Sequence, residues 1–129
     1  MCVFCEIVKG NIPSYKVYED DNYLAILDIS QTTMGHTLVM PKKHYDNILA
    51  MDKNEAGELM ATAQDVGKNI VKKLNANGLN ILVNTNEVAG QSVMHTHVHL
   101  IPRYDNNDSI DIKFKENKFN LEDILNKVK

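Results

Sequence analysis

The sequence of 129 residues lacks several features that would point to a membrane, secreted or nucleic-acid-binding protein. It has no apolar run near the roughly 20 residues that a membrane-spanning helix needs. Its start is too short for a secretory leader and carries Glu6, so we expect a cytoplasmic protein. The 14 basic residues form no long cluster and the formal net charge is −3, which argues against binding to nucleic acid.

Cysteine is also scarce, since the chain has only Cys2 and Cys5. A disulfide-stabilised domain needs more cysteines and an oxidising compartment. Two cysteines separated by two residues are instead typical of half a metal site or of a redox motif. The strand-helix-strand pattern of a thioredoxin-type redox protein is missing around these residues, which favours the metal site.

Apolar residues, in contrast, make up 43% of the chain, enough for a single folded domain over residues 1–129. Strand patterns cover residues 15–29 (two strands with a turn at 19–22), 37–41, 79–84 and 93–102. An apolar stripe at spacings of three and four starts after Asp52 and ends near Asn77, which predicts one long helix. Residues 121–128 predict a short terminal helix capped by Asn120. The short connections favour antiparallel pairing, so the predicted fold class is α+β.

Three of the five histidines alternate along the last predicted strand, as His95, His97 and His99. Residues two apart in a strand lie on one face, so we expect a face of imidazoles opposite a mostly apolar face. Both ring nitrogens of a buried histidine need a partner, which disfavours a purely structural role for all three. Two functional interpretations stay open: a metal centre, and catalysis in which imidazole acts as nucleophile or as acid and base.

A polar loop before these histidines favours the second interpretation. Ala89-Gly90-Gln91-Ser92 combines a glycine with an amide and a hydroxyl, and Asn84 ends the neighbouring predicted strand. Glycine lets backbone N–H groups approach an anion, and the polar side chains add donors. Donors that converge beside a histidine predict a phosphate site.

The segment from Gly90 to Ile101 resembles the histidine triad (HIT) family, whose signature is His-x-His-x-His followed by two apolar residues. That signature is complete here as His95-Thr96-His97-Val98-His99-Leu100-Ile101. Residues 27–30, 35–39 and 41–44 resemble upstream segments of the family in the same order, and the resemblance covers residues 2–103. The tail, residues 104–129, is not distinctive. The fold implied is a five-stranded antiparallel sheet with one long helix packed on it and short terminal helices.

The resemblance implies a nucleotide hydrolase that acts at the α-phosphorus of a purine nucleoside phosphoramidate or a related conjugate. His97 would attack and form a covalent nucleotidyl intermediate, which water would convert to the nucleoside monophosphate. His99 would contact the phosphate and assist the leaving group. The residues implied for nucleotide binding are Asp28 at the ribose, His36 near the catalytic strand, Asn84, Gly90, Gln91 and Ser92 at the phosphate, and Phe4, Ile7, Ile26 and Ile29 around the base.

The resemblance also implies one structural zinc ion per chain and no organic cofactor. By position, its ligands would be Cys2, Cys5, His44 and His95. A homodimer that pairs through the long helix and a strand is implied as well. Three alternatives stay open: a dinucleoside polyphosphate hydrolase, a nucleotide-binding or sensing module without turnover, and a hydrolase with catalytic zinc on the triad. The chain has no tryptophan, so it lacks the tryptophan-bearing C-terminus of the eukaryotic phosphoramidase branch.

Overall fold

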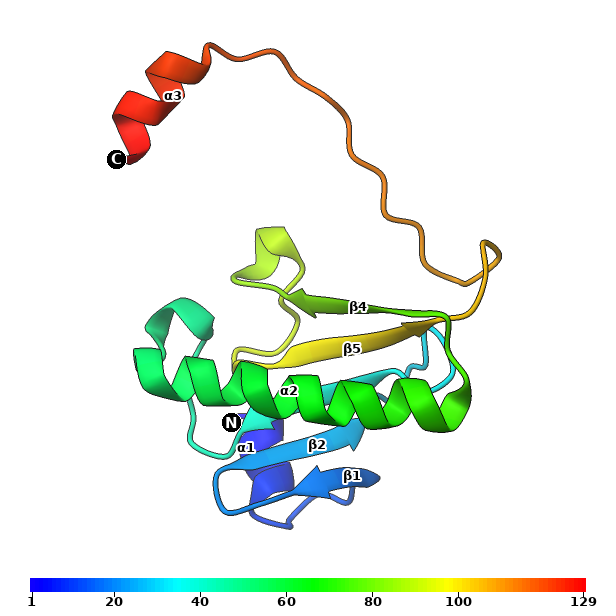
Figure 1. The fold of residues 1–129 in the computed structure, drawn as a ribbon. Helices are drawn as coiled ribbons and strands as arrows, with labels where there is room; N and C mark the ends of the chain where they lie inside the picture. Colours follow the sequence, from blue (N-terminus) through cyan, green and yellow to red (C-terminus); the bar gives the residue numbers. More distant parts are fainter.

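A five-stranded antiparallel sheet forms the centre of the computed structural model, which describes all 129 residues (Figure 1). The strands are β1 (Lys16–Glu19), β2 (Tyr23–Leu27), β3 (Thr37–Pro41), β4 (Gly78–Val83) and β5 (Val98–Arg103). Their order across the sheet is β1-β2-β3-β5-β4, and every neighbouring pair is antiparallel. The helices are α1 (Val3–Val8), α2 (Lys53–Leu74) and α3 (Leu121–Val128), with short 3-10 turns η1 (Ile48–Ala50) and η2 (Glu87–Ala89). The predicted α+β fold is confirmed, and no helix is long and apolar enough to cross a membrane.

The long helix α2 covers one face of the sheet (Figure 1). Asp52 caps its first turn, because the carboxylate accepts hydrogen bonds from the backbone N–H groups of Asn54 and Glu55. The predicted stripe is buried against the sheet, in a core made of Leu59, Ala63, Val66 and Ile70 of α2 and Tyr23, Ala25, Val39, Met51, Val98 and Leu100. Gly67 permits this close contact, since a Cβ atom there would lie 2.9 Å from the Leu79 side chain.

The helix α1 packs on the opposite face, over β2 and β3. A second core forms there from Phe4 and Ile7 of α1 with Leu24, Ile26, Leu38 and Met40 of the sheet. Leu38 pairs across the sheet with His99, so the side chain of His99 projects toward this same face. The face of β5 that carries His99 therefore lies beside α1, on the side of the sheet away from α2.

The beginning and the end of the last strand differ from the prediction. The strand predicted over residues 93–102 starts only at Val98 and continues through Pro102 to Arg103. Before Val98 the chain has left the sheet, and the Thr96 N–H donates to the carbonyl oxygen of Tyr45 at 2.8 Å. Pro102 lies beyond the last pairing of β3 with β5, so its missing N–H removes no hydrogen bond between these two strands.

The chain after β5 turns away from the body of the protein and ends in α3, which lies apart from the sheet (Figure 1). The turn is fixed at its start, because Arg103 Nε donates to Asp108 at 3.0 Å and Asn77 donates to the Tyr104 carbonyl at 2.6 Å. The predicted helix over residues 121–128 is confirmed, with Asn120 as its N-cap. None of its residues is buried.

Candidate active site and metal centre

All five histidines of the chain gather in two clusters near the beginning of β5. His99 belongs to one cluster, together with Asp28 and His36, and His97 lies next to it with ring centroids 5.0 Å apart. The second cluster consists of Cys2, Cys5, His44 and His95. The atoms able to bind a metal lie within 4.8 Å of one another among Asp28, His36 and His99, and likewise among Cys2, Cys5, His44 and His95. We call them the catalytic cluster, which includes His97, and the metal cluster.

His97 is held in one orientation by the backbone two residues earlier. Its Nδ1 donates to the carbonyl oxygen of His95 at 2.7 Å, so the neutral ring carries its proton on Nδ1 and its lone pair on Nε2. His97 Nε2 has no hydrogen-bond partner in the protein. Because every fully buried side-chain nitrogen and oxygen does have a partner, His97 Nε2 is in contact with solvent. Burial lowers the pKa of His97, which keeps the ring neutral at pH 7.

A chain of hydrogen bonds assigns the protons of the other two rings in the catalytic cluster. The backbone N–H of Thr32 donates to His36 Nδ1 at 3.4 Å, which leaves the proton of the neutral His36 ring on Nε2. His36 Nε2 then donates to His99 Nδ1 at 3.0 Å, so the His99 proton lies on Nε2. Burial, aided by neighbouring His97 and His36, lowers the pKa of His99 to about 4, and His99 is therefore a neutral donor at pH 7.

Two ring nitrogens of opposite character thus lie side by side. His97 Nε2 offers a lone pair, and His99 Nε2 offers an N–H group with no partner in the protein. Asp28 lies at the edge of this cluster, with its carboxylate 3.6 Å from His36 Nε2 and accepting a hydrogen bond from the Ser30 N–H at 2.8 Å. The structure therefore brings Asp28, the residue expected at the ribose, together with His36, His97 and His99.

The loop after β4 places two of the predicted phosphate residues in contact. Asn84 Nδ2 donates to the Gly90 carbonyl at 3.3 Å. Gly90 has φ 104°, a conformation that favours glycine, and a Cβ atom there would lie 3.3 Å from the Asn84 amide. Ser92 is exposed and lines two cavities, of about 600 and 500 Å³, and the larger of these is also lined by Cys2 and His44.

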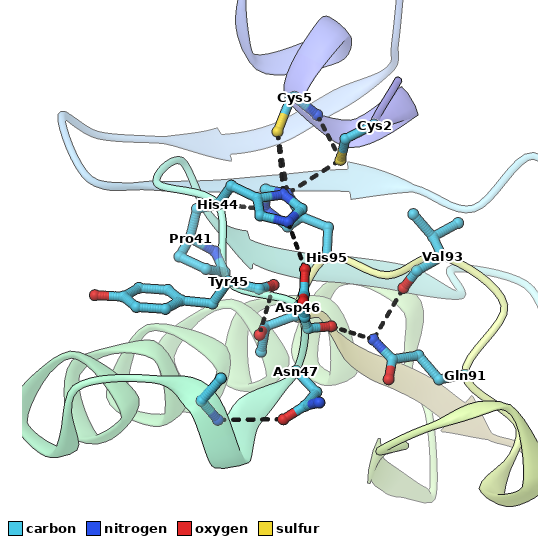
Figure 2. A network of polar contacts seen from close by, with 12 residues as sticks. Cys2, Cys5, Pro41, His44, Tyr45, Asp46, Asn47, Gln91, Val93 and His95 are labelled. Carbon is cyan, nitrogen blue, oxygen red and sulfur yellow. Dashed lines mark hydrogen bonds and ion pairs between the residues drawn. The ribbon is translucent and has the colours of Figure 1, made fainter.

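Gln91 requires a correction, because its side chain is fully used within the protein. It is only 2% exposed, and its Nε2 donates to the carbonyl oxygens of Asp46 at 2.6 Å and Val93 at 3.0 Å. Its Oε1 accepts from the Asn86 N–H at 2.8 Å. Gln91 therefore ties the loop after β3 to the segment that leads into the histidines (Figure 2), and no donor is left for a phosphate.

The residues expected around the base lie in two different environments. Phe4, Ile7 and Ile26 belong to the core under α1, and the ring of Phe4 stands edge-on to that of His97 with centroids 5.1 Å apart. Ile29, by contrast, is 91% exposed. Phe4 is thus the apolar side chain that the structure places beside the catalytic cluster.

The metal cluster has the dimensions of a tetrahedral zinc site. Zinc–sulfur bonds of about 2.3 Å and zinc–nitrogen bonds of about 2.05 Å separate neighbouring ligand atoms by roughly 3.3–3.8 Å. Cys2 Sγ and Cys5 Sγ lie 3.4 Å and 3.5 Å from His95 Nδ1, and Cys5 Sγ lies 3.3 Å from His44 Nδ1. The two Nδ1 atoms are 3.2 Å apart. These separations, with two thiols and two imidazoles as donors, fit a zinc ion at the centre of the four side chains.

The hydrogen bonds behind these ligands point their lone pairs at that same place (Figure 2). His95 Nε2 donates to the Pro41 carbonyl and His44 Nε2 donates to the Asp46 carboxylate, both at 2.8 Å. In neutral rings both protons are then on Nε2, so two Nδ1 lone pairs face each other and two sulfur atoms. A cation at the centre would satisfy all four atoms, and ligand histidines held by an oxygen at the far nitrogen are typical of metal sites.

Three functional partners were missed by reasoning from the sequence. Asp46 orients His44, the Pro41 carbonyl orients His95, and the Thr32 N–H assigns the proton of His36. Asp46 had a usable signal, since a carboxylate two residues after a candidate ligand can reach its far nitrogen. The other two are backbone groups, which every residue has, so the sequence carries no sign of them.

Comparison with known proteins agrees with this geometry. A profile described as the HIT domain matches residues 9–106. This chain belongs to the HIT family. The HIT protein is 46% identical to Protein hit of Bacillus subtilis over 88% of this chain and 79% of that protein. It is 44% identical to the uncharacterized HIT-like protein MJ0866 of Methanocaldococcus jannaschii over 100% of this chain and 99% of the relative. It is 39% identical to adenylylsulfatase HINT3 of Arabidopsis thaliana over 79% of this chain and 52% of that protein.

Solved structures of other HIT proteins share the fold. The structure of SMU.412c from Streptococcus mutans superposes with a TM-score of 0.90 at 46% identity, covering 99% of this chain and 85% of that one. A histidine triad nucleotide-binding protein from Candida albicans gives 0.85 at 27% identity, covering 98% and 91%. A zinc-bound histidine triad family protein from Mycobacterium smegmatis gives 0.71 at 40% identity, covering 82% and 77%.

Proposed function

We propose that this HIT protein is a nucleotide hydrolase that acts at the α-phosphorus of purine nucleoside phosphoramidates or related nucleotide conjugates. The observation that carries the proposal is the placement of the His97 Nε2 lone pair beside the His99 Nε2–H donor, on rings 5.0 Å apart. Displacement at phosphorus needs such a nucleophile, and a donor for the charge that develops on oxygen or on the leaving atom. The relatives described as an adenylylsulfatase and as a nucleotide-binding protein support the same class of ligand.

In the first step, His97 Nε2 attacks the α-phosphorus and the bond from phosphorus to the leaving nitrogen breaks. The electron pair leaves with that nitrogen, which takes a proton and departs as an amine. The His97 ring gains positive charge as it bonds to phosphorus, and the His95 carbonyl stabilises this charge because it already accepts the Nδ1 proton at 2.7 Å. His99 Nε2–H donates to the leaving atom or to a phosphate oxygen.

In the second step, water attacks phosphorus and the bond to His97 Nε2 breaks. The hydroxyl stays on phosphorus as part of the nucleoside monophosphate, and the remaining proton balances the one taken by the amine. His97 returns to its starting state with its proton still on Nδ1. Division into two displacements gives each step a well-placed nucleophile.

The remaining residues would bind and orient the nucleotide. The Asp28 carboxylate would accept the ribose hydroxyls, because it lies at the edge of the catalytic cluster and only one of its oxygens is held by Ser30. Asn84 and Ser92 would donate to the phosphate. Gly90 would shape the loop around it, since its own N–H donates to the Glu87 carbonyl at 2.9 Å. Phe4 would contact the base from beside His97.

The metal cluster would hold one zinc ion per chain in a structural role. Bound zinc would neutralise the converging lone pairs of Cys2, Cys5, His44 and His95 and fix the N-terminus to the segment before β5. The residues of the chain do the rest: the ring of His95 is held by Pro41, and its carbonyl holds His97. The zinc-bound relative from Mycobacterium smegmatis supports this assignment.

A trapping experiment tests the mechanism directly. Brief mixing of the protein with an adenosine phosphoramidate, followed by acid-free quenching and peptide mass spectrometry, should find a nucleotidyl adduct on His97. The adduct and turnover should both be absent in His97→Ala. Turnover that persists without an adduct overturns the proposal. So does turnover that needs a second metal ion besides the one in the metal cluster, and either result favours catalytic zinc on the triad.

A second candidate function is hydrolysis of dinucleoside polyphosphates. The open, solvent-facing side of Ser92, which borders two cavities, favours a leaving group larger than ammonia. Turnover numbers measured side by side for adenosine phosphoramidate, adenylyl sulfate and diadenosine polyphosphates rank the leaving groups. Binding of adenosine monophosphate without turnover of any of them indicates a sensing module instead.

A further inference from the structure

The loop between β2 and β3 carries a polar side chain that the proposed function does not use, Gln31. This loop begins at Asp28 and ends at His36, so the residue proposed for the ribose lies at one end and the donor to His99 lies at the other. Gln31 is exposed, yet its side chain forms three hydrogen bonds, all of them within the loop. An exposed amide can bond to water instead, so these three bonds indicate a role in the conformation of the loop.

The Gln31 amide joins the two ends of the loop. Its Nε2 donates to the Asp28 carbonyl oxygen at 2.6 Å and to the His36 carbonyl oxygen at 2.7 Å, which uses both of its N–H bonds. Its Oε1 accepts from the Gly35 N–H at 2.8 Å. The backbone adds one bond between the same ends, since the Asp28 N–H donates to the His36 carbonyl at 3.0 Å. One side chain and one backbone bond therefore fix Asp28 and His36 relative to each other.

The middle of the loop is attached to the body of the protein independently of Gln31. The buried Thr33 hydroxyl donates to the Pro102 carbonyl oxygen in β5 at 2.6 Å. The Tyr104 hydroxyl, just after β5, donates to the Met34 carbonyl oxygen at 2.6 Å. Removal of the Gln31 amide should therefore leave the loop attached to β5 and change only the relation between its two ends.

The relation between the two ends matters because their side chains meet. The Asp28 carboxylate lies 3.6 Å from His36 Nε2, the nitrogen that donates to His99 at 3.0 Å. The carboxylate is itself held by a single hydrogen bond, from the Ser30 N–H at 2.8 Å. A shift of Asp28 relative to His36 would therefore move the ribose site relative to the ring that faces the phosphate.

We propose that Gln31 is a positioning residue for nucleotide binding, which holds the ribose-binding carboxylate of Asp28 at a fixed place beside His36 and His99. This inference rests on the proposed function, because it assigns Gln31 a part in the same site. Gln31 acts through backbone groups and contacts no substrate atom. The role requires an amide, since two donors and one acceptor must face three backbone groups at once. Methionine has a similar length and no donor, and glutamate places an oxygen opposite two carbonyl oxygens.

Calorimetric titration of the full chain with adenosine monophosphate and with its 2′,3′-dideoxy analogue tests the proposal. The two ligands differ only in the ribose hydroxyls, so the ratio of their dissociation constants measures ribose recognition alone. We expect the unmodified protein to bind adenosine monophosphate at least about 10-fold more tightly than the analogue, because hydrogen bonds to a charged carboxylate are lost in the analogue. In Gln31→Met the ratio should fall to about 3-fold or less, and Gln31→Glu should bind adenosine monophosphate more weakly still.

Thr33→Val is the matched control, because it removes a bond from the loop to β5 and no bond between Asp28 and His36. It should lower the melting temperature and keep the ratio of the unmodified protein. A ratio unchanged in Gln31→Met, or lowered equally in Thr33→Val, overturns the inference and leaves the proposed function standing. An unmodified protein that binds neither ligand, or binds both equally, contradicts the nucleotide site of the proposed function, and the inference fails with it.

A double-mutant cycle tests whether Gln31 acts through Asp28. If it does, the double variant Asp28→Ala/Gln31→Met should bind adenosine monophosphate within about 2-fold of Asp28→Ala alone, because the carboxylate that Gln31 positions is already absent. The two single substitutions should then show losses of affinity that do not add. Additive losses place the effect of Gln31 elsewhere in the protein and contradict the proposal.

Discussion

The metal cluster and the catalytic cluster use histidine in opposite ways. In the metal cluster, His44 and His95 each donate from Nε2 to an oxygen, so their Nδ1 lone pairs converge at 3.2 Å. In the catalytic cluster the protons alternate from Thr32 through His36 to His99, so no two lone pairs face each other. A cation would balance the converging lone pairs of the first arrangement, whereas the second leaves one lone pair on His97 and one N–H group on His99 available to a substrate. The partner of the far ring nitrogen, rather than the spacing of the histidines, decides what each ring can do.

The two clusters meet in one residue. The ring of His95 belongs to the metal cluster, and its carbonyl oxygen holds the Nδ1 proton of His97. Phe4 also touches both, with its ring centroid 5.9 Å from that of His95 and 5.1 Å from that of His97. Substitutions in the catalytic cluster should therefore leave the zinc content unchanged, while substitutions in the metal cluster should lower both the zinc content and the turnover. Zinc content and turnover, measured together, separate the two.

The largest effect is expected from His97→Ala. Turnover of an adenosine phosphoramidate should fall by at least about 10⁴-fold, because no other ring offers a lone pair at that place. The zinc content should stay at the level of the unmodified protein, since His97 contributes no ligand atom to the metal cluster. Steady-state kinetics and elemental analysis on the same preparation check both. If His97→Ala keeps more than a tenth of the turnover, His97 is not the nucleophile and the proposed difference between the two clusters is wrong.

The next effect is expected from Cys5→Ser. Zinc should fall from about one equivalent to near zero and the melting temperature should drop, because two imidazole lone pairs lose their cation. Turnover should decrease by about 10- to 100-fold as His95 shifts and with it the carbonyl that orients His97. His99→Asn is the matched control, since it should lower turnover and retain the metal. Normal stability and turnover without metal argue against the link through His95.

A smaller effect is expected at His36, whose contribution is one donated hydrogen bond. His36→Phe should reduce turnover about 5- to 10-fold, because the worth of one hydrogen bond is about 1 kcal/mol and His99 loses the donor that assigns its proton. His36→Asn keeps a donor and should recover part of this loss. Zinc content should be unchanged in both. If both substitutions lower turnover equally, the proton assignment through His36 is wrong.

The pH dependence of turnover sharpens the description of the catalytic cluster. Burial lowers the pKa of both His97 and His99, and attack requires a neutral His97. As the pH falls, protonation should therefore begin to remove activity only below the ordinary histidine value of about 6.5. A profile of kcat/KM that is flat from pH 8 to 6.5 and declines below it is expected, whereas a decline that begins above pH 7 contradicts it.

The smallest effect on turnover is expected from Gln91→Ala. Because Gln91 satisfies three backbone groups and no substrate atom, its loss should lower the free energy of unfolding by about 2 kcal/mol with little change in KM. Ser92→Ala is the neighbouring comparison and should raise KM while changing stability by less than about 0.5 kcal/mol. Chemical denaturation and kinetics on the two variants test this, and a raised KM for Gln91→Ala restores it as a phosphate residue.

Reasoning from the sequence succeeded where side-chain pattern and structure have the same period. The predicted strand over residues 37–41 is β3 with the same bounds, and the apolar stripe after Asp52 is buried in α2 as expected. The prediction for residues 93–97 is wrong, because alternating histidines look like a strand whether or not the backbone pairs. There the Thr96 N–H binds Tyr45 instead of a neighbouring strand, and nothing in the residue types reveals that choice.

The candidate site shows the same division between side chains and backbone. Cys2, Cys5, His44 and His95 were predicted to lie together and do. Gln91 was predicted at a phosphate, since an amide in a glycine-containing loop suits an anion equally well. In the structure, carbonyl oxygens of Asp46 and Val93 occupy its donors. Such competition between ligand and backbone becomes visible only when the loop conformation is known.

The close approach of the two Nδ1 atoms in the metal cluster limits how descendants of this sequence can vary. A lineage that loses Cys2 and Cys5 loses the cation, and two lone pairs 3.2 Å apart then repel each other. His44 has an exposed ring and can be replaced by a residue that donates, whereas His95 is buried and bound to Pro41. Across an alignment, positions 2, 5 and 44 should therefore change as a set while position 95 stays histidine. Loss of the metal would then be visible in related sequences as three substitutions that occur together, beside one histidine that does not change.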